Sequence, residues 1–104
     1  MELKHEFEQK MISDSDIVRK KHHYYPSYYR QLIARIGGVD AAKALLATDE
    51  RLQEGLIKLW ELKCLEYSME ALVLNPKYSI LFTPGELNVA RKRLERLEYK
   101  PNYD

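Results

Sequence analysis

The class of fold is decided by one stretch near the end of the chain, TPGELNVARKRLERL, which spans residues 83–97. Thr83 suits the N-cap of a helix, Pro84 its first position and Glu86 the N3 position, and together they form a capping box. Apolar residues then recur at helical spacing along one side of the stretch: Leu87, Ala90, Leu94 and Leu97. The pattern predicts a continuous helix over residues 84–97.

Helical spacing extends over almost all of the chain before this stretch. Apolar residues recur three and four positions apart, and no segment alternates with the period of two that marks a strand. Only four glycines and four prolines interrupt the 104 residues. We therefore expect an all-α protein, a compact bundle of five to seven short helices. Before residue 83, the expected helices cover residues 2–12, 13–21, 27–36, 39–47, about 52–60 and 69–74, with a single turn over 77–82.

Local signals set the boundaries of these helices. The polar run Ser13–Asp16 offers N-cap groups, so we expect one helix to end there and another to begin. Pro26 interrupts the chain, because a residue that precedes proline disfavours the α conformation. Gly37 suits a left-handed residue after a helix, and Gly38 a flexible joint. Gly55 weakens its helix by ~1 kcal/mol relative to alanine, which predicts a late helix start or a close approach of neighbouring backbone.

The apolar stripes also predict which side chains form the core. Tyr28 shares a helical stripe with Leu32 and Ile36, so we expect its ring to be buried. Three stripes on different helices should meet in the interior. The side chains expected at that meeting point are Leu59 or Trp60, Leu72 and Leu94.

Length and composition fit one domain. A chain of 104 residues forms one compact core, and 32% charged with 45% hydrophobic residues are typical of a globular protein. We expect one helical domain over residues 1–98, with 1–25 as a helical extension of a core at 26–98, and a frayed tail at 99–104. The longest apolar runs have four residues, which predicts no membrane span. The single Cys64 excludes an intramolecular disulfide and predicts a cytoplasmic protein.

Five motifs stand out after residue 26: GGVDAAK (37–43), LWEL (59–62), MEALVLNPKY (69–78), LFTPGEL (81–87) and ARKRL (90–94). They resemble a small uncharacterised bacterial all-helical module that occurs alone or as a terminal appendage of larger proteins. The resemblance covers about residues 26–98 and rests on cap, turn and core residues. It implies a helical fold and assigns no catalytic residue. It also implies a setting among proteins of nucleic-acid metabolism or defence.

Side chains that carry chemistry are few. Glu2 and His5 have a spacing that puts both on one helical face, but a metal site needs further ligands in the same pattern. The adjacent residues His22 and His23 would point about 100° apart on a helix. We therefore interpret both as solvated histidines. Cys64 has no histidine base paired with it in the sequence, so we interpret it as a small buried hydrophobe. We therefore expect no metal, no cofactor, no catalytic residue and no enzymatic activity.

The segment Arg19–Arg30 is the unusual feature, because four tyrosines follow three basic residues. Tyrosines beside a proline are typical of protein interfaces, whereas basic residues with aromatic rings can hold single-stranded nucleic acid. The interface candidates are Tyr24, Tyr25 and Tyr29. The nucleic-acid candidates include a second group on the basic face of the last helix: Arg19, Lys20, Lys21, Arg30, Lys92, Arg93 and Arg96.

We favour a non-catalytic protein–protein interaction domain or regulatory accessory, whose partner is an unidentified protein or a second copy of the chain. The alternative is a weak nucleic-acid-binding module, as in phage or bacterial defence, because the helices that flank Gly37-Gly38 resemble a helix-turn-helix. The alternative ranks second because the net charge is only +1. The would-be recognition helix over residues 40–46 also offers one cation, Lys43.

Overall fold

The structure is a computed structural model that describes residues 2–48 and 53–103. Within these residues every regular element is helical and there is no strand, so the all-α prediction is confirmed. The α-helices are α1 (Leu3–His22), α2 (Ser27–Ile36), α3 (Gly38–Ala47), α4 (Gln53–Glu61), α5 (Met69–Leu74) and α6 (Pro84–Arg96). The described residues also form the short 3-10 helices η2 (Leu65–Tyr67) and η3 (Ser79–Leu81).

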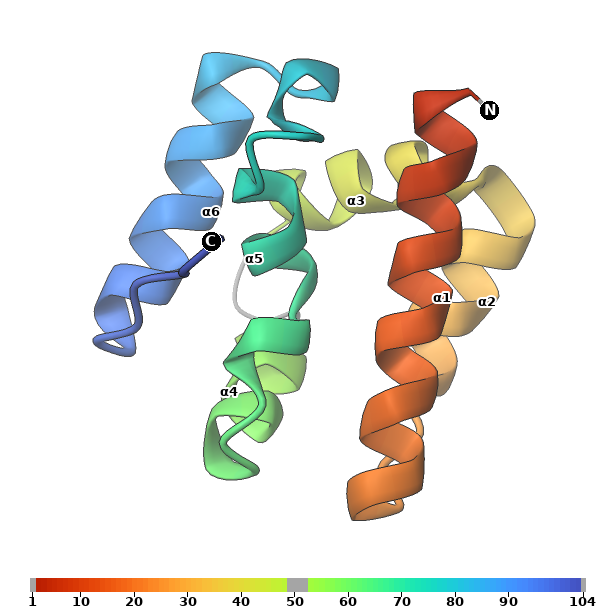
Figure 1. The fold of residues 1–104 in the computed structure, drawn as a ribbon, viewed down its shortest axis with the longest axis vertical. Coiled ribbons are helices and arrows are strands. Elements are labelled where there is room, and N and C mark those ends of the chain that lie inside the picture. The colour runs from red at the N-terminus through yellow and green to blue at the C-terminus, as the bar shows by residue number, and fades with distance from the viewer. Residues whose placement is uncertain (1, 49–52, 104) are drawn as a thin grey trace.

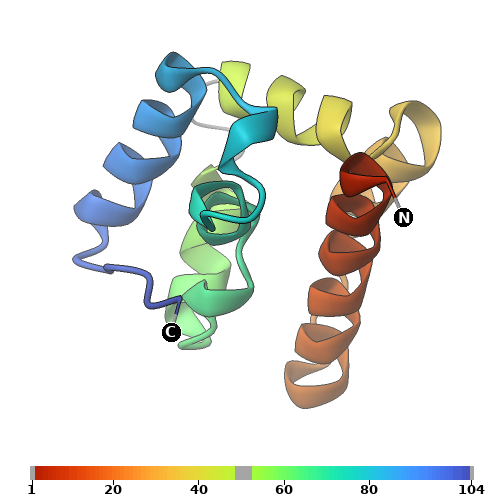
Figure 2. The same ribbon diagram turned by 45° about the horizontal axis from the view of Figure 1, so that its top comes forward.

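The helices form two groups that α3 joins. α1 and α2 run antiparallel as a pair on one side of the molecule, and α5 and α6 pack together on the other (Figure 1). α3 crosses between the groups and contacts α1, α2 and α6. The turned view again places α1 and α6 at opposite sides, with α4 and α5 between them (Figure 2). The α1–α2 pair and the α4–α5 region therefore face each other beneath α3.

Helix α1 is one continuous element, so the predicted break at Ser13–Asp16 is wrong. The Ser15 hydroxyl donates to the Ile12 carbonyl within the helix, at 2.8 Å, and caps nothing. The same hydroxyl accepts a hydrogen bond of 2.9 Å from Arg30 of α2, which ties the two helices together. The chain leaves α1 at His23, which adopts a left-handed conformation with φ of 55°.

The turn between α2 and α3 depends on both of its glycines. Gly37 has φ of 90°, a value that favours glycine, so the predicted positive φ is confirmed. Gly38 is buried at the start of α3, and the prediction of a flexible joint is wrong. A Cβ at Gly38 would lie 2.8 Å from the Cα of Glu8 in α1. The Glu8 carboxylate accepts a 2.7 Å hydrogen bond from the Gly38 N–H, one of the free donors at a helix start. Gly38 is therefore a packing contact between α1 and α3.

A main core fills the space among α1, α2, α3, α5 and α6. Phe7 of α1 is fully buried, and its ring packs against those of Tyr78 and Phe82 at centroid distances of 5.5 and 5.3 Å. α3 supplies five of the buried side chains of this core. The α3 side chains buried in the main core are Val39, Ala41, Ala42, Leu45 and Leu46.

A second, smaller group of apolar side chains, the α4 cluster, lies beneath α4. Its buried members are Leu56, Leu65, Ala71 and Leu94, with Leu59, Leu74, Leu97 and Tyr99 packed against them. Leu72 belongs to the main core, so the predicted meeting of Leu72 with Leu59 and Leu94 in one place is wrong. Trp60 is 49% exposed and is no core residue. On α4, Trp60 and Leu56 lie four positions apart, and only Leu56 turns inward.

The caps of α5 and α6 follow the sequence closely. Ser68 accepts a hydrogen bond from the Ala71 N–H, and Thr83 and Glu86 form the predicted capping box with both hydrogen bonds present. α6 runs from Pro84 to Arg96, which confirms the predicted last helix. After α6 the chain returns to the fold at Tyr103, whose hydroxyl donates to the Ala71 carbonyl of α5.

Candidate functional site

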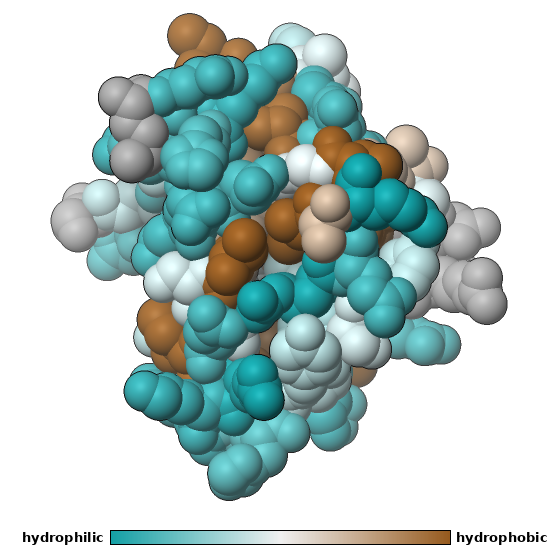
Figure 3. Space-filling model, turned by 90° about the vertical axis from the view of Figure 1, so that its right-hand side faces the viewer, coloured by the Kyte–Doolittle hydropathy of each residue, from teal (hydrophilic) through white to brown (hydrophobic). Residues whose placement is uncertain are grey.

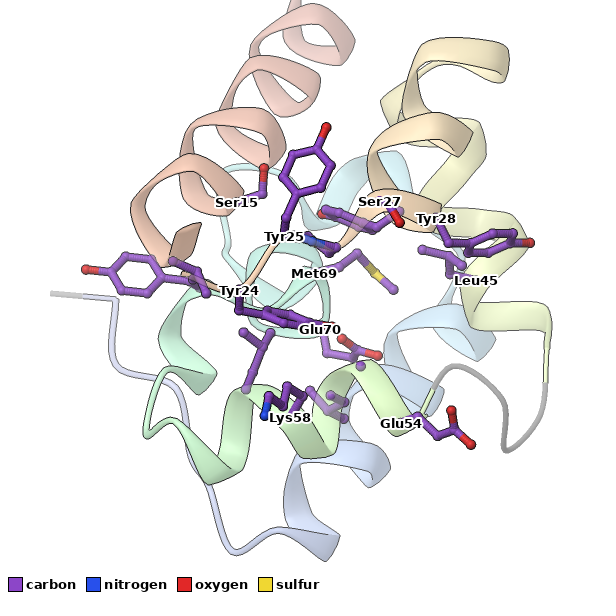
Figure 4. A pocket seen from close by; sticks show the side chains of 17 residues that line it. Ser15, Tyr24, Tyr25, Ser27, Tyr28, Leu45, Glu54, Lys58, Met69 and Glu70 are labelled. Carbon is purple, nitrogen blue, oxygen red and sulfur yellow. The ribbon is translucent and has the colours of Figure 1, made fainter. Parts of the chain in front are cut away.

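A cleft of about 490 Å³ lies between the α1–α2 pair and the α4–α5 region. The tyrosine-rich segment 24–29 supplies one wall, all six of its residues lining the cleft. Glu54, Lys58 and Leu59 of α4 form the opposite wall, and Met69 and Glu70 of α5 lie deeper (Figure 4). Its volume is within the roughly 300–1,000 Å³ of ligand sites.

The tyrosines of this segment divide between the interior and the rim. Tyr24 crosses the cleft toward α4, where a Cβ at Gly55 would meet its hydroxyl at 4.0 Å. Among the described residues no neighbouring backbone atom lies within 4 Å of that Cβ, so the predicted close approach of backbone at Gly55 is wrong. Tyr29 packs against the main core, whereas Tyr28 is 61% exposed. The prediction that Tyr28 is the buried ring is wrong, because α2 turns the neighbouring position inward.

Glu70, in the deep lining of the cleft, forms a buried ion pair at 3.1 Å with Arg93 of α6. The Arg93 guanidinium also donates to the carbonyls of Leu45 and Thr48, at 3.1 and 2.7 Å, at the end of α3. A cation suits this position, because the last carbonyls of a helix lack partners and carry the negative end of its dipole. Arg93 is only 6% exposed, so its assignment to an outer basic face is wrong. Burial raises the pKa of Glu70, and Arg93 opposes this shift only in part.

Three cations lie over tyrosine rings at the mouth of the cleft. The Arg19 and Arg30 guanidinium groups lie 5.0 and 5.8 Å from the centre of the Tyr25 ring, and the Lys21 ammonium lies 5.8 Å from that of Tyr67. Arg30 is in addition paired with Asp16 at 2.7 Å. Tyr25 is half exposed, and it is the interface candidate that the structure places at the surface. Arg19 and Arg30 therefore already lie over the Tyr25 ring, on which a nucleic-acid base would have to stack.

A second electrostatic feature lies on the inner side of the α1–α2 pair. Asp14 is buried, and burial raises the pKa of its carboxyl group. The Lys10 ammonium lies 3.1 Å from Asp14 Oδ1, but this oxygen accepts no hydrogen bond of good geometry. Burial raises the pKa of Tyr29, and the charges of Glu70 and Asp14 raise it further. The Tyr29 hydroxyl therefore stays protonated and can act as a hydrogen-bond donor.

The arrangement of the other cations does not suit the helix-turn-helix interpretation. α3, the would-be recognition helix, is held among α1, α2 and α6, and Lys43 is paired with Glu86 at 2.9 Å. A recognition helix must instead present one face to the major groove. Lys20, Lys92 and Arg96 are exposed, but Lys20 lies on α1 and the other two on α6, at opposite sides of the molecule (Figures 1 and 2). The nucleic-acid candidates therefore do not form one basic face.

The remaining candidates for chemistry lie outside the cleft. Cys64 is buried, and burial raises the pKa of its thiol, so it behaves as the small hydrophobe that the sequence indicates. In residues 2–48 and 53–103, no group of three or more potential metal ligands comes together. The helices of that same part of the chain include none with the length and apolar character needed to cross a membrane.

A second groove of about 450 Å³ follows the outer side of the α1–α2 pair. Seen from this side, the molecular surface carries small apolar patches between hydrophilic side chains (Figure 3). The groove is lined by Ile12, Ile33 and Ala34 together with the charged side chains of Glu8 and Arg30. Its surface is shallower and has fewer aromatic groups than the cleft, so we take the cleft as the candidate site.

The sequence pattern marks the wall of the cleft formed by residues 24–29, but it does not mark the wall formed by α4. The segment 24–29 is conspicuous for its tyrosines, but no pattern in the sequence indicates that Glu70 lines a cleft. A signal for Arg93 was present, because it lies three residues after Ala90 and four before Leu97, on the buried seam of α6. No family model matches the chain, and neither a curated protein nor a solved structure is significantly similar to it. The resemblance to a bacterial helical module stays a prediction.

Proposed function

We propose that this chain is a non-catalytic interaction domain that receives an apolar side chain of a protein partner in the tyrosine-lined cleft. The observation that carries the proposal is the concave wall formed by residues 24–29 opposite α4, with tyrosine rings both inside it and at its rim. Tyrosine supplies a large contact area with few rotatable bonds, and it is enriched at the energetic centres of interfaces. A reducing cytoplasm suits the free, buried Cys64.

The placement of the cations supports this proposal over the nucleic-acid alternative. Of the seven basic candidates, Arg93 is buried in an ion pair and Arg30 is paired with Asp16. Nucleic-acid binding depends on several cations that contact successive phosphates along one strand. The exposed candidates are instead divided between α1 and α6, with α4 and α5 between these helices. An aromatic cleft needs no such row of cations.

Site-specific photocrosslinking tests the proposal. A benzoylphenylalanine residue is placed at the exposed rim position of Tyr28, and in a matched control at Ile80 of η3, which is 81% exposed and lies outside the cleft. We expect the probe at position 28 to form a discrete protein adduct in native lysate, with and without nuclease. The probe at position 80 should form none. Adducts that disappear with nuclease would favour the nucleic-acid alternative, and equal adducts from both positions would contradict the proposal.

A further inference from the structure

Exposed cations lie beside the cleft, over the tyrosine rings of Tyr25 and Tyr67 and on α4. Arg19 and Lys21 are exposed and lie over the rings of Tyr25 and Tyr67, two of the lining residues. Lys58 is exposed and lines the opposite wall. In the described part of the chain, none of these three cations forms an ion pair with a carboxylate. These three cations are therefore available to pair with carboxylates of a partner.

The acidic groups near the cleft offset this charge only in part. Asp16 is paired with Arg30 at 2.7 Å, and Glu70, deep in the lining of the cleft, is buried and paired with Arg93. Glu54 is the exposed carboxylate among the described lining residues. The three cations without a carboxylate partner outnumber this exposed lining carboxylate, while the deeper lining includes the apolar side chains of Met69 and Leu56. Such a site is complementary to an apolar group that is flanked by negative charge.

We infer that the cleft selects an acidic segment of a partner protein, with one bulky apolar side chain in the cleft and neighbouring carboxylates on Arg19, Lys21 and Lys58. The inference rests on the proposed function and names the class of its partner. Contact with the tyrosine faces restrains two of these cations before the partner arrives. Less side-chain freedom is then lost when the carboxylates bind.

Fluorescence anisotropy with four labelled 12-residue peptides tests the inference on the full chain. The first peptide has a central phenylalanine flanked by aspartate and glutamate. The second replaces the acidic residues by asparagine and glutamine, the third replaces phenylalanine by serine, and the fourth replaces the acidic residues by lysine. We expect the second and third peptides to bind about tenfold more weakly than the first, a difference equivalent to ~1.4 kcal/mol. The fourth should show no saturable binding.

Two triple variants with the same loss of charge locate the effect. Arg19→Gln/Lys21→Gln/Lys58→Gln removes the rim cations, and Arg91→Gln/Lys92→Gln/Arg96→Gln removes three exposed cations from α6 on the opposite side of the molecule. We expect the rim variant to bind the acidic phenylalanine peptide about tenfold more weakly and the control variant to bind it normally. Lys58→Gln alone, which disturbs no contact with a ring, should give a smaller loss in the same direction.

Several outcomes would overturn the inference. Equal binding of the acidic and neutral peptides would remove the charge preference, although the cleft would still be an apolar docking site as the proposed function requires. Equal binding of the serine peptide, or of a single-stranded oligonucleotide of the same charge, would show that the rim attracts any polyanion. Binding of no peptide would reject this partner class, while the crosslink at position 28 would still test the proposed function separately.

Discussion

The main core and the α4 cluster are built from similar side chains at similar helical spacings, yet they differ in how far they are enclosed. α3 is surrounded by α1, α2 and α6, and its buried residues occupy most of its circumference. α4 makes its main contacts with η2 and buries Leu56 on one side, while Ile57 and Trp60 stay exposed. Burial of a helical stripe is therefore decided by the number of neighbouring helices, and the stripe by itself does not predict it.

The largest effect should come from the ion pair between the two regions. Arg93→Gln leaves Glu70 buried without its charged partner and removes donors from the carbonyls of Leu45 and Thr48. Loss of one partner of a buried pair typically costs about 3–5 kcal/mol. Chemical denaturation measures the change, with Arg91→Gln as the exposed control on the same helix. A loss of less than about 1 kcal/mol would mean that Arg93 is dispensable for the packing of α3 on α6.

The next effect should come from the contact between α1 and α3. In Gly38→Ala, the new Cβ would lie 2.8 Å from the Glu8 backbone, so the helices must separate. Overpacking of this kind typically costs about 1–3 kcal/mol. Gly85→Ala is the matched control, because its Cβ would meet the Thr83 hydroxyl oxygen at 3.8 Å, an ordinary contact. If both variants melt at the wild-type temperature, α1 and α3 are less closely packed than the structure has them.

The N-cap of α6 should give a smaller change. Thr83→Ala removes the acceptor for the Glu86 N–H, and loss of such a cap costs about 1 kcal/mol. Thr83→Ser keeps the hydroxyl and should restore most of the stability. Thermal unfolding of the two variants side by side separates the hydrogen bond from the packing of the threonine methyl group. Equal destabilisation by alanine and serine would contradict the role of the cap.

The smallest effect should come from the exposed side of α4, with the buried side of the same helix as the comparison. Trp60 is half exposed, so Trp60→Ala should reduce the free energy of unfolding by less than about 1 kcal/mol. Leu56→Ala on the buried side of the same helix should cost about 2–5 kcal/mol. Urea titrations followed by circular dichroism compare the pair. A larger loss from Trp60→Ala than from Leu56→Ala would reverse the orientation of α4.

Features set by neighbouring residues were predictable from the sequence, and features set by distant contacts were not. The capping box at Thr83 and the cap at Ser68 were readable because each involves residues three positions apart. Adjacent Tyr28 and Tyr29 differ by about 100° around α2, and only the positions of α1 and α3 decide which of them is buried. The cleft forms where α4 approaches the segment 24–29. This approach depends on the tertiary fold, so no local sequence pattern predicts it.

The contacts of Arg93 also bear on how the molecule opens. A single guanidinium group joins the end of α3, the start of α5 and the last turn of α6. These three helices should therefore lose their amide protection in hydrogen exchange together, as one cooperative unit. α4 takes no part in this junction and packs mainly on a 3-10 turn, so its amides should exchange earlier. One wall of the cleft would then open and close on a shorter timescale than the core behind it, which gives a partner access without global unfolding.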